Sequence, residues 1–332
     1  MAWRTPRSWY RRRAPAGLLW LLATPAARLW AAASARRIAD GARFDPGVPV
    51  ICVGNLTLGG EGKTPIAREL VRWLGARGLA AAILTRGHAG RLKGPIEVDP
   101  TLHSAHDVGD EALMLAKDAS VWVARDRAAG AQAAVAAGAR LIVMDDGHQN
   151  GGLRKLLSLV VVDGETRDGA WPFGDGSVFP AGPLREPLDQ GLARADAVVL
   201  LLPADLAEPD PELLAVLDSK PILIARLVPE RPPPPARQLA FAGIGKPWKF
   251  QRALAAAGAE LVDFVPLADH QPLTEPLLAG LARRAGGAGL ITTEKDAARL
   301  PPAWRAKVSV WPVRAVFDDQ SALAAVLAPA LS

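Results

Sequence analysis

Hydrophobic runs separated by helix-like or polar stretches follow one another along most of the chain. The runs are rich in β-branched residues and contain few charges. They are VPVICV, AAAILT, SVWVA, RLIVM, LSLVVVD, DAVVLLLP and KPILIARL, beginning at residues 48, 80, 120, 140, 157, 196 and 220. Continuous apolar runs of this length are typical of strands that helices cover on both faces of a sheet.

Segments with helical patterns lie between several of these runs, for example at 65–78 (PIARELVRWLGARG) and 125–139 (RDRAAGAQAAVAAGA). Strands that alternate with helices favour parallel pairing, because the helix carries the chain back across the sheet. We therefore predict an α/β fold, an α/β/α sandwich around a largely parallel sheet.

A proline-rich stretch, VPERPPPPAR at 228–237, interrupts this alternation and cannot form regular helix or sheet. Beyond it the alternation resumes with RQLAFAGI, ELVDFVPL, GLITTE and VSVWPVRAVF, beginning at residues 237, 260, 289 and 308. We predict four parts: an N-terminal helix region (1–40), a nucleotide-binding domain (41–228), a linker or hinge (229–237) and a smaller α/β domain that closes over the cleft (238–332).

The N-terminal segment contains an apolar stretch, APAGLLWLLATPAARLWAAASARR, with only about 14 uncharged residues before Arg28, short of the ~20 that span a bilayer. Its leucines recur at helical spacing, arginines flank both ends, and three tryptophans can lie at the level of lipid headgroups. These residues are Leu18, Leu21, Leu22 and Leu29, with Trp9, Trp20 and Trp30. The pattern favours a helix in the plane of a membrane interface.

Two alternatives remain for this segment. An arginine-rich start, an apolar stretch and an AASA site also suit a signal peptide, although Pro25 and Arg28 interrupt the apolar part. The segment can also be an ordinary amphipathic helix packed on the domain behind it.

Composition narrows the class of protein. The chain has 332 residues, 50% hydrophobic and 22% charged, enough for a large core and for two domains. The net charge is +5, and the excess is concentrated at the start, where Arg4, Arg7, Arg11, Arg12 and Arg13 precede any acidic residue. This excess favours an anionic partner, either phospholipid or nucleic acid. The single cysteine, Cys52, excludes disulfides within the chain and cysteine-rich metal sites.

The sequence GGEGKT follows the first strand and precedes a helical segment, which is the context of a phosphate-binding loop. Its backbone amides can point at phosphate oxygens, Lys63 can reach the β and γ phosphates, and Thr64 can ligate Mg²⁺. The loop consists of Gly59, Gly60, Glu61, Gly62, Lys63 and Thr64, and Thr57 stands where the usual pattern has glycine. We predict ATP and Mg²⁺ as cofactors; the alternative is a glycine turn with a solvated lysine.

Ligands of open parallel sheets bind beyond the carboxyl ends of the strands, where this chain has several charged residues. Asp145, after LIVM, suits a second anchor for Mg²⁺. Asp146 can bind the metal, orient a water or simply form a turn before Gly147. Arg86 and Arg185 can clamp phosphate, although both can equally be surface arginines.

Phosphoryl transfer to an alcohol also needs a base for the hydroxyl proton. Asp110, in HDVGDEALMLAK, stands just before an apolar helical run, where it can be that base or a helix N-cap. His270, in PLADHQPL, can be functional or an ordinary loop histidine. The residues alone leave both choices open.

The motifs GNLTLGGEGKTP, TRGH, GDEA, DDGHQN, PAGPLREP, ADH and TTEKD, in this order, resemble the tetraacyldisaccharide 4'-kinase family of the lipid A pathway. The match runs over nearly the whole chain, and the combination is specific although no single motif is. It implies transfer of the γ-phosphate of ATP to the 4'-hydroxyl of an acylated glucosamine disaccharide 1-phosphate. It also implies a peripheral or monotopic enzyme on the cytoplasmic face of the bacterial inner membrane, without nucleic acid or an obligatory protein partner.

The resemblance assigns roles by position. It puts Lys63 and Thr64 in the phosphate loop, Asp145, Asp146 and Glu186 at the metal, Arg185 beside them, Asp110 as catalytic base and His270 as its partner across the cleft. Glu294 and Lys295 become candidates for holding the second domain or the nucleotide. The family usually has tyrosine at His88, histidine at Asn150 and a small residue at Glu61.

Two other classes of protein stay open. The compact phosphate loop also resembles switch ATPases of the partitioning and metallochaperone class, which act on a protein partner. Those proteins usually carry lysine where Leu58 stands. A membrane-surface binding protein with a relic loop is the second alternative, and the intact Lys63, Thr64 and Asp145 argue against it.

Overall fold

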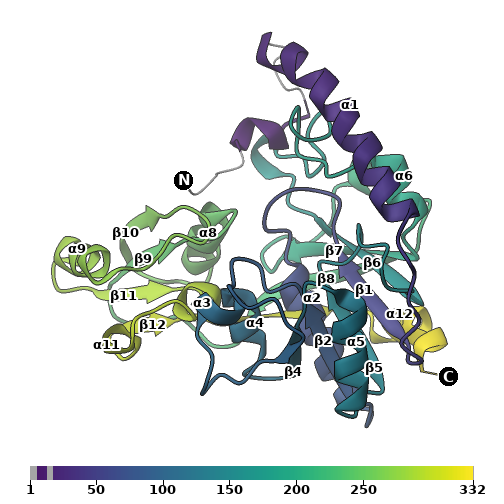
Figure 1. Ribbon diagram of the computed structural model, residues 1–332. Coiled ribbons are helices and arrows are strands. Elements are labelled where there is room, and N and C mark those ends of the chain that lie inside the picture. The colour runs from purple at the N-terminus through teal and green to yellow at the C-terminus, as the bar shows by residue number, and fades with distance from the viewer. Residues whose placement is uncertain (1–5, 13–17, 332) are drawn as a thin grey trace.

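The computed structural model describes residues 6–12 and 18–331, which form two α/β units and an N-terminal helix (Figure 1). Arg4 and Arg13, of the arginines noted above, lie outside the described residues. The larger unit contains a nine-stranded sheet and the smaller unit a four-stranded one. The α/β class predicted from the hydrophobic pattern is confirmed.

The large sheet has the strand order β13-β8-β7-β6-β1-β5-β2-β4-β3. Its strands are β1 (Val50–Gly54), β2 (Ala81–Thr85), β3 (Ile96–Glu97), β4 (Ser120–Val123), β5 (Leu141–Asp145), β6 (Leu157–Asp163), β7 (Ala197–Pro203), β8 (Ile222–Pro229) and β13 (Val313–Phe317). The strands from β8 to β4 pair in parallel, whereas β3 and β13 pair antiparallel at the two edges. The sheet is therefore largely parallel, as expected.

Helices cover both faces of this sheet. They include α2 (Lys63–Gly75), α3 (Ala105–Val108), α4 (Asp110–Leu115), α5 (Arg127–Ala136), α6 (Leu188–Ala193), α7 (Pro211–Leu217) and α12 (Gln320–Leu327). Alternate residues of β1 face opposite layers, since Ile51 shares a core cluster with Leu70 of α2 and Val50 shares one with Ala131 of α5. This packing explains why the central strands carry apolar residues on both faces.

The smaller unit is a parallel sheet of order β10-β9-β11-β12 with its own core. Its elements are β9 (Gln238–Ala242), α8 (Pro247–Ala256), β10 (Leu261–Pro266), α9 (Glu275–Ala285), β11 (Gly289–Thr292), α10 (Glu294–Ala297), α11 (Pro302–Arg305) and β12 (Val308–Val310). Figure 1 shows this unit, in green and yellow, to the left of the larger one.

The C-terminal part of the chain returns to the large unit. Strand β13 pairs antiparallel with β8, and residues of α12 join the core cluster of the large sheet. The predicted second domain, 238–332, is thus too long, because its sheet ends at Val310. The apolar run at 308–317 looks continuous, but Pro312 has no N–H to donate and divides it between two sheets.

Two segments consequently join the units, 230–237 and 311–312. They contact each other through a hydrogen bond from the indole N–H of Trp311 to the carbonyl of Arg231, 2.9 Å long. Residues 230–237 form neither helix nor strand, in agreement with their proline content. Their action as a hinge stays a prediction.

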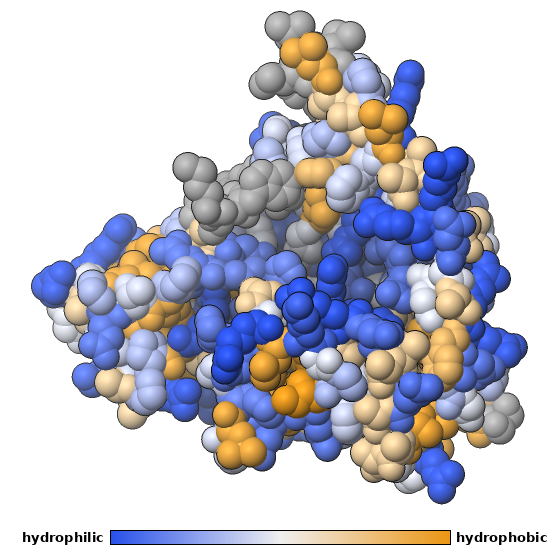
Figure 2. Space-filling view, viewed as in Figure 1, coloured by the Kyte–Doolittle hydropathy of each residue, from blue (hydrophilic) through white to orange (hydrophobic). Residues whose placement is uncertain are grey.

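Helix α1 (Leu18–Ala39) projects from the large unit at the top of Figure 1. Leu22 and Leu29 are 67% and 74% exposed, and Figure 2 shows apolar atoms beside hydrophilic ones along this helix. Two tryptophans face the large unit instead: the indole of Trp20 donates to Ser177 Oγ at 3.1 Å and that of Trp30 to the Arg185 carbonyl at 3.1 Å. Among the helices of residues 6–12 and 18–331, none is long and apolar enough to cross a membrane.

Candidate active site

The phosphate loop lies between β1 and α2, at the carboxyl edge of the large sheet. Helix α2 begins at Lys63, and Gly62 occupies the N-cap position with a φ of 83°, which favours glycine. Thr64 and Pro65 follow in the first turn, where a missing N–H costs little. The loop therefore has the strand, turn and helix context that its sequence predicts for phosphate binding.

Asp145 ends β5, which pairs with β1 so that Asp145 lies opposite Val53. The hydroxyl of Thr64 donates to Asp145 Oδ2 across 3.4 Å. Asp145 is buried, and its Oδ1 has no hydrogen-bond partner among the described residues. Burial, with the charges of Glu111 and Asp146, raises the pKa of Asp145 to about 7. A buried oxygen ligand without a donor fits Mg²⁺, so Thr64 and Asp145 are suited to hold that ion.

Asp146 has a different environment from Asp145. Its Oδ1 accepts a hydrogen bond from Arg185 at 2.9 Å and lies 3.6 Å from Lys63 Nζ. The Asp146 side chain is 41% exposed; partial desolvation would raise its pKa, but Lys63 and Arg185 outweigh this effect and lower the pKa. The residue has a φ of 55°, a strained value for a side chain other than glycine. Asp146 thus contacts Lys63 and Arg185, two of the three cations that the sequence assigns to phosphate.

Glu186 contacts residues outside the Thr64–Asp145 pair, and Arg86 is exposed. Glu186 is buried, accepts from Gln149 Nε2 at 2.9 Å and forms an ion pair with Arg194. Both of its carboxylate oxygens therefore have donors, unlike those of Asp145, and its part in metal binding stays a prediction. Arg86 follows β2 and is exposed; its charge adds to the burial that lowers the pKa of Arg127 to about 10.

Asp110 and His270 meet from different units of the protein. Asp110 is the first residue of α4, whereas Gly109 has the N-cap position, so an N-cap role for Asp110 is not observed. Its Oδ2 lies 3.0 Å from His270 Nδ1. His270, in the loop after β10, has a φ of 56°. A strained residue held against a buried carboxylate is characteristic of functional sites.

The neighbours of this pair determine its protonation. Lys295 Nζ lies 3.3 Å from His270 Nε2, and a lysine ammonium can only donate. The same Nε2 lies 3.7 Å from Asp269 Oδ1. Because an ionised carboxylate can only accept, His270 Nδ1 carries the proton donated to Asp110. Burial would raise the pKa of Asp110, but the hydrogen bond from His270 and the charges of Lys295 and Arg299 lower it. Asp110 is consequently an ionised, hydrogen-bonded carboxylate.

The Asp110–His270 pair lies beside the Thr64–Asp145 pair. Glu111, the residue after Asp110, is close enough to raise the pKa of Asp145. Lys295 bridges Glu111 at 3.1 Å and Asp269 at 3.2 Å. Glu294 pairs instead with Arg68 of α2 at 3.1 Å, which links the two units. The candidate base, the candidate metal ligands and the phosphate loop therefore share one region.

Several charged residues of this region were missed by the sequence interpretation. Arg299 Nε lies 3.4 Å from Asp110, and Arg127 is buried near Asp145. Arg299 lies two residues beyond the end of α10, so helical spacing from Lys295 gives no signal for it. Nothing local distinguishes Arg127 from other arginines, because its importance comes from tertiary contacts.

Two of the three positions that depart from the family pattern, His88 and Asn150, also have defined contacts. The ring centroids of His88 and His270 are 5.0 Å apart. The side-chain oxygen of Asn150 accepts from the Gly152 N–H at 3.0 Å, within its own turn. His88 therefore lies in the candidate active site beside His270, whereas Asn150 stabilises the backbone of its own turn.

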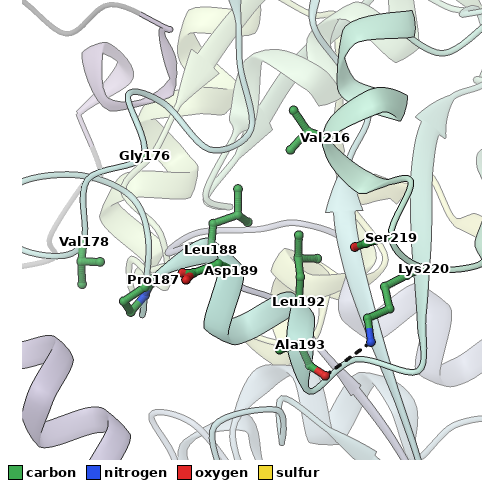
Figure 3. Close-up of a pocket in the computed structure, with 10 residues that line it drawn as sticks. All are labelled: Gly176, Val178, Pro187, Leu188, Asp189, Leu192, Ala193, Val216, Ser219 and Lys220. Atoms are coloured by element: carbon green, nitrogen blue, oxygen red, sulfur yellow. Dashed lines mark hydrogen bonds between the residues drawn. The ribbon is translucent and has the colours of Figure 1, made fainter.

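A separate apolar hollow of about 1070 Å³ lies between α6, α7 and the segment around Gly176 (Figure 3). Leu188 and Leu192 on α6 and Val216 on α7 face this space in Figure 3. None of the site residues predicted from the sequence lines it. The candidate active site therefore lies outside this apolar hollow.

Comparison with solved structures supports the fold. The chain superposes on LpxK from Aquifex aeolicus, solved in complex with ATP, with a TM-score of 0.72 and 24% identity. The match covers 95% of this chain and 100% of that one. At 24% identity, this match shows that the two chains share a fold.

Comparison of sequences identifies the family. The family model for tetraacyldisaccharide-1-P 4'-kinase matches residues 18–332. A tetraacyldisaccharide 4'-kinase of Phenylobacterium zucineum is 63% identical, covering 97% of this chain and 98% of the relative. Those of Caulobacter vibrioides and Hyphomonas neptunium are 59% and 48% identical, covering 97% and 96% of this chain and 97% and 94% of their own lengths. The chain therefore belongs to the tetraacyldisaccharide 4'-kinase family.

Proposed function

We propose that this protein transfers the γ-phosphate of ATP to the 4'-hydroxyl of a tetraacyldisaccharide 1-phosphate, with Asp110 as the base. The observation that carries the assignment of the base is the 3.0 Å contact of buried, ionised Asp110 with His270, next to the Thr64–Asp145 pair. Family membership supports the reaction and its lipid disaccharide acceptor.

Each residue has a defined task in this reaction. Lys63 and the backbone amides of 59–64 bind the β and γ phosphates. Asp110 accepts the 4'-hydroxyl proton as that oxygen forms its bond to the γ phosphorus, and the bond to the β–γ bridging oxygen breaks to release ADP. His270 orients Asp110 through its Nδ1–H. Thr64 and Asp145 would hold Mg²⁺, which when bound neutralises charge on the phosphates.

The direct test follows phosphate from nucleotide to lipid. The protein is incubated with γ-labelled ATP, Mg²⁺ and detergent-dispersed tetraacyldisaccharide 1-phosphate, and label is measured in the lipid phase. We expect labelled lipid from the wild type and none above background from Lys63→Ala, because Lys63 contacts the phosphates. Label released only as free phosphate would contradict the kinase assignment and favour a switch ATPase.

We also propose that α1 lies in a membrane interface, on the cytoplasmic face of the bacterial inner membrane. The exposed Leu22 and Leu29 support it, as do Arg36 and Arg37 in the last turn of the helix. An acceptor whose acyl chains are embedded in a bilayer requires the enzyme to work at the headgroup plane.

We expect Leu22→Ser/Leu29→Ser to reduce partition onto anionic vesicles by at least about tenfold, because burying one leucine contributes ~1.5–3 kcal/mol. Vesicle sedimentation measures the partition. Leu102→Ser, which changes a leucine that is 78% exposed on the large unit, is the matched control. Equal partition of the double variant and the wild type would argue against this role of α1.

A further inference from the structure

A buried cluster of charges joins the phosphate loop to the smaller unit. Lys246, just before α8, has its Nζ 3.0 Å from Glu61 Oε1 and 2.5 Å from Asp163 Oδ2. Lys249 also pairs with Asp163. The side chains of Lys246, Glu61 and Asp163 are only 8%, 1% and 6% exposed. Lys246 Nζ also lies 4.6 Å from the ring centroid of Tyr10, in the N-terminal segment.

The backbones of the two units touch at the same place. A Cβ added to Gly245 would lie 2.7 Å from the backbone nitrogen of Gly60, closer than side chains tolerate. Glu61 Oε2 accepts the backbone N–H of Asp163 at 3.2 Å, so both oxygens of Glu61 have partners. The segment before α8 is therefore seated directly on the phosphate loop, and Lys246 is its buried charged contact.

The electrostatics of this cluster bear on nucleotide binding. A carboxylate within a phosphate loop repels polyphosphate, and a buried charge is costly unless it is paired. In this cluster two carboxylates face two ammonium groups, so their charges cancel. The carboxylates are those of Glu61 and Asp163, and the ammonium groups those of Lys246 and Lys249. Burial would lower the pKa of Lys246, but Asp163 and Glu61 raise it, which keeps the ammonium charged. Without Lys246, Glu61 would present an uncompensated negative charge to the phosphates.

We propose that Lys246 is a positioning residue that neutralises Glu61 and thereby makes tight nucleotide binding depend on the seating of the smaller unit on the phosphate loop. The inference rests on the proposed ATP-dependent function. Lys246 acts through Glu61 and is not itself assigned to the reacting atoms. The sequence feature that it explains is Glu61, a carboxylate at a position where a small residue is more common.

The test compares the dissociation constants of ATP, ADP and AMP for the full-length protein. We expect Lys246→Met to weaken ATP binding by at least about tenfold, because breaking a buried ion pair leaves a charge uncompensated. The loss of affinity in Lys246→Met should be largest for ATP, smaller for ADP and smallest for AMP, because the repulsion scales with the charge of the phosphates. The kcat at saturating ATP should change by less than about threefold, because the reacting groups are unaltered.

Two further variants separate charge from structure. Glu61→Gln/Lys246→Met restores the balance, leaving the Asp163–Lys249 pair, and should bind ATP within about threefold of wild type. Glu61→Gln alone should bind ATP at least as tightly as wild type. Arg252→Met is the matched control, because Arg252 lies on α8 and pairs across the units with Glu165 at 3.2 Å without contacting Glu61. We expect it to stay within about twofold of wild type.

The outcomes are distinguishable. Wild-type ATP affinity in Lys246→Met, or weakened ATP binding in Glu61→Gln, would overturn this inference and leave the proposed function standing. If Lys246→Met does not fold, Glu61→Gln and the double variant decide the matter. A wild-type protein that binds no ATP would overturn the proposed function and this inference together.

Discussion

Asp110→Asn should lower kcat by about 10²–10⁴-fold, the range that a positioned general base contributes. The amide is similar in size to the carboxylate but cannot accept the hydroxyl proton. Asp110 does not contact Lys63 or Thr64 in the described hydrogen bonds and ion pairs, so the dissociation constant of ATP should stay within about threefold. Steady-state transfer to detergent-dispersed lipid measures kcat, and calorimetry measures ATP binding.

A neighbouring carboxylate gives the control for this prediction. Asp107 belongs to the capping box of α3, where it accepts from the backbone and hydroxyl of Ser104 at 2.9 and 2.6 Å. Asp107→Asn should lower the stability only slightly, because the amide oxygen can still accept from Ser104, and should retain most of the turnover. If Asp110→Asn behaved in the same way, with activity kept, Asp110 would be a structural residue.

His270→Gln provides a second check on the same site. Glutamine can donate one hydrogen bond to Asp110 but lacks the imidazole that Lys295 fixes on its other side at 3.3 Å. The lowered pKa of Asp110 depends first on the hydrogen bond from His270 among the groups that stabilise its charge. His270→Gln, which retains a donor to Asp110, should therefore lower kcat less than Asp110→Asn does.

The phosphate loop and the strands were predictable because their signals are local. A strand, a glycine-rich turn and Lys63-Thr64 follow one another within a few residues, and the parallel sheet leaves apolar runs at each strand. Asp145 could be placed at the same edge as the loop because the carboxyl ends of parallel strands share an edge. The sequence alone could not separate Asp145 from Asp146.

Contacts between distant segments were not predictable in this way. The return of β13 to the large sheet depends on Pro312, whose effect on a continuous apolar run is visible only when both sheets are known. Trp20 and Trp30 suit a membrane interface by type, yet their indoles bond to the large unit. The pairing of Glu61 with Lys246 joins residues 185 positions apart, and neither position predicts the other.

The different environments of Asp145 and Asp146 lead to opposite expectations for metal binding. Asp145→Asn should weaken Mg²⁺ binding in the presence of a non-hydrolysable ATP analogue by at least the ~10–100-fold seen when groups that merely support a metal ligand are changed. Without Mg²⁺, the same variant should bind the analogue at least as tightly as wild type, because a buried carboxylate no longer opposes the phosphates. Calorimetric titration of each component measures both effects.

Asp146→Asn is the matched variant, because it removes the adjacent carboxylate and leaves the open oxygen of Asp145 in place. It should keep Mg²⁺ binding within about tenfold of wild type and release Lys63 and Arg185, which Asp146 contacts at 3.6 and 2.9 Å, for the phosphates. Loss of Mg²⁺ binding in Asp146→Asn, with retention in Asp145→Asn, would reverse the assignment. Loss in both variants would instead mean that the two carboxylates bind the metal jointly, since each would then supply an oxygen that the other cannot replace.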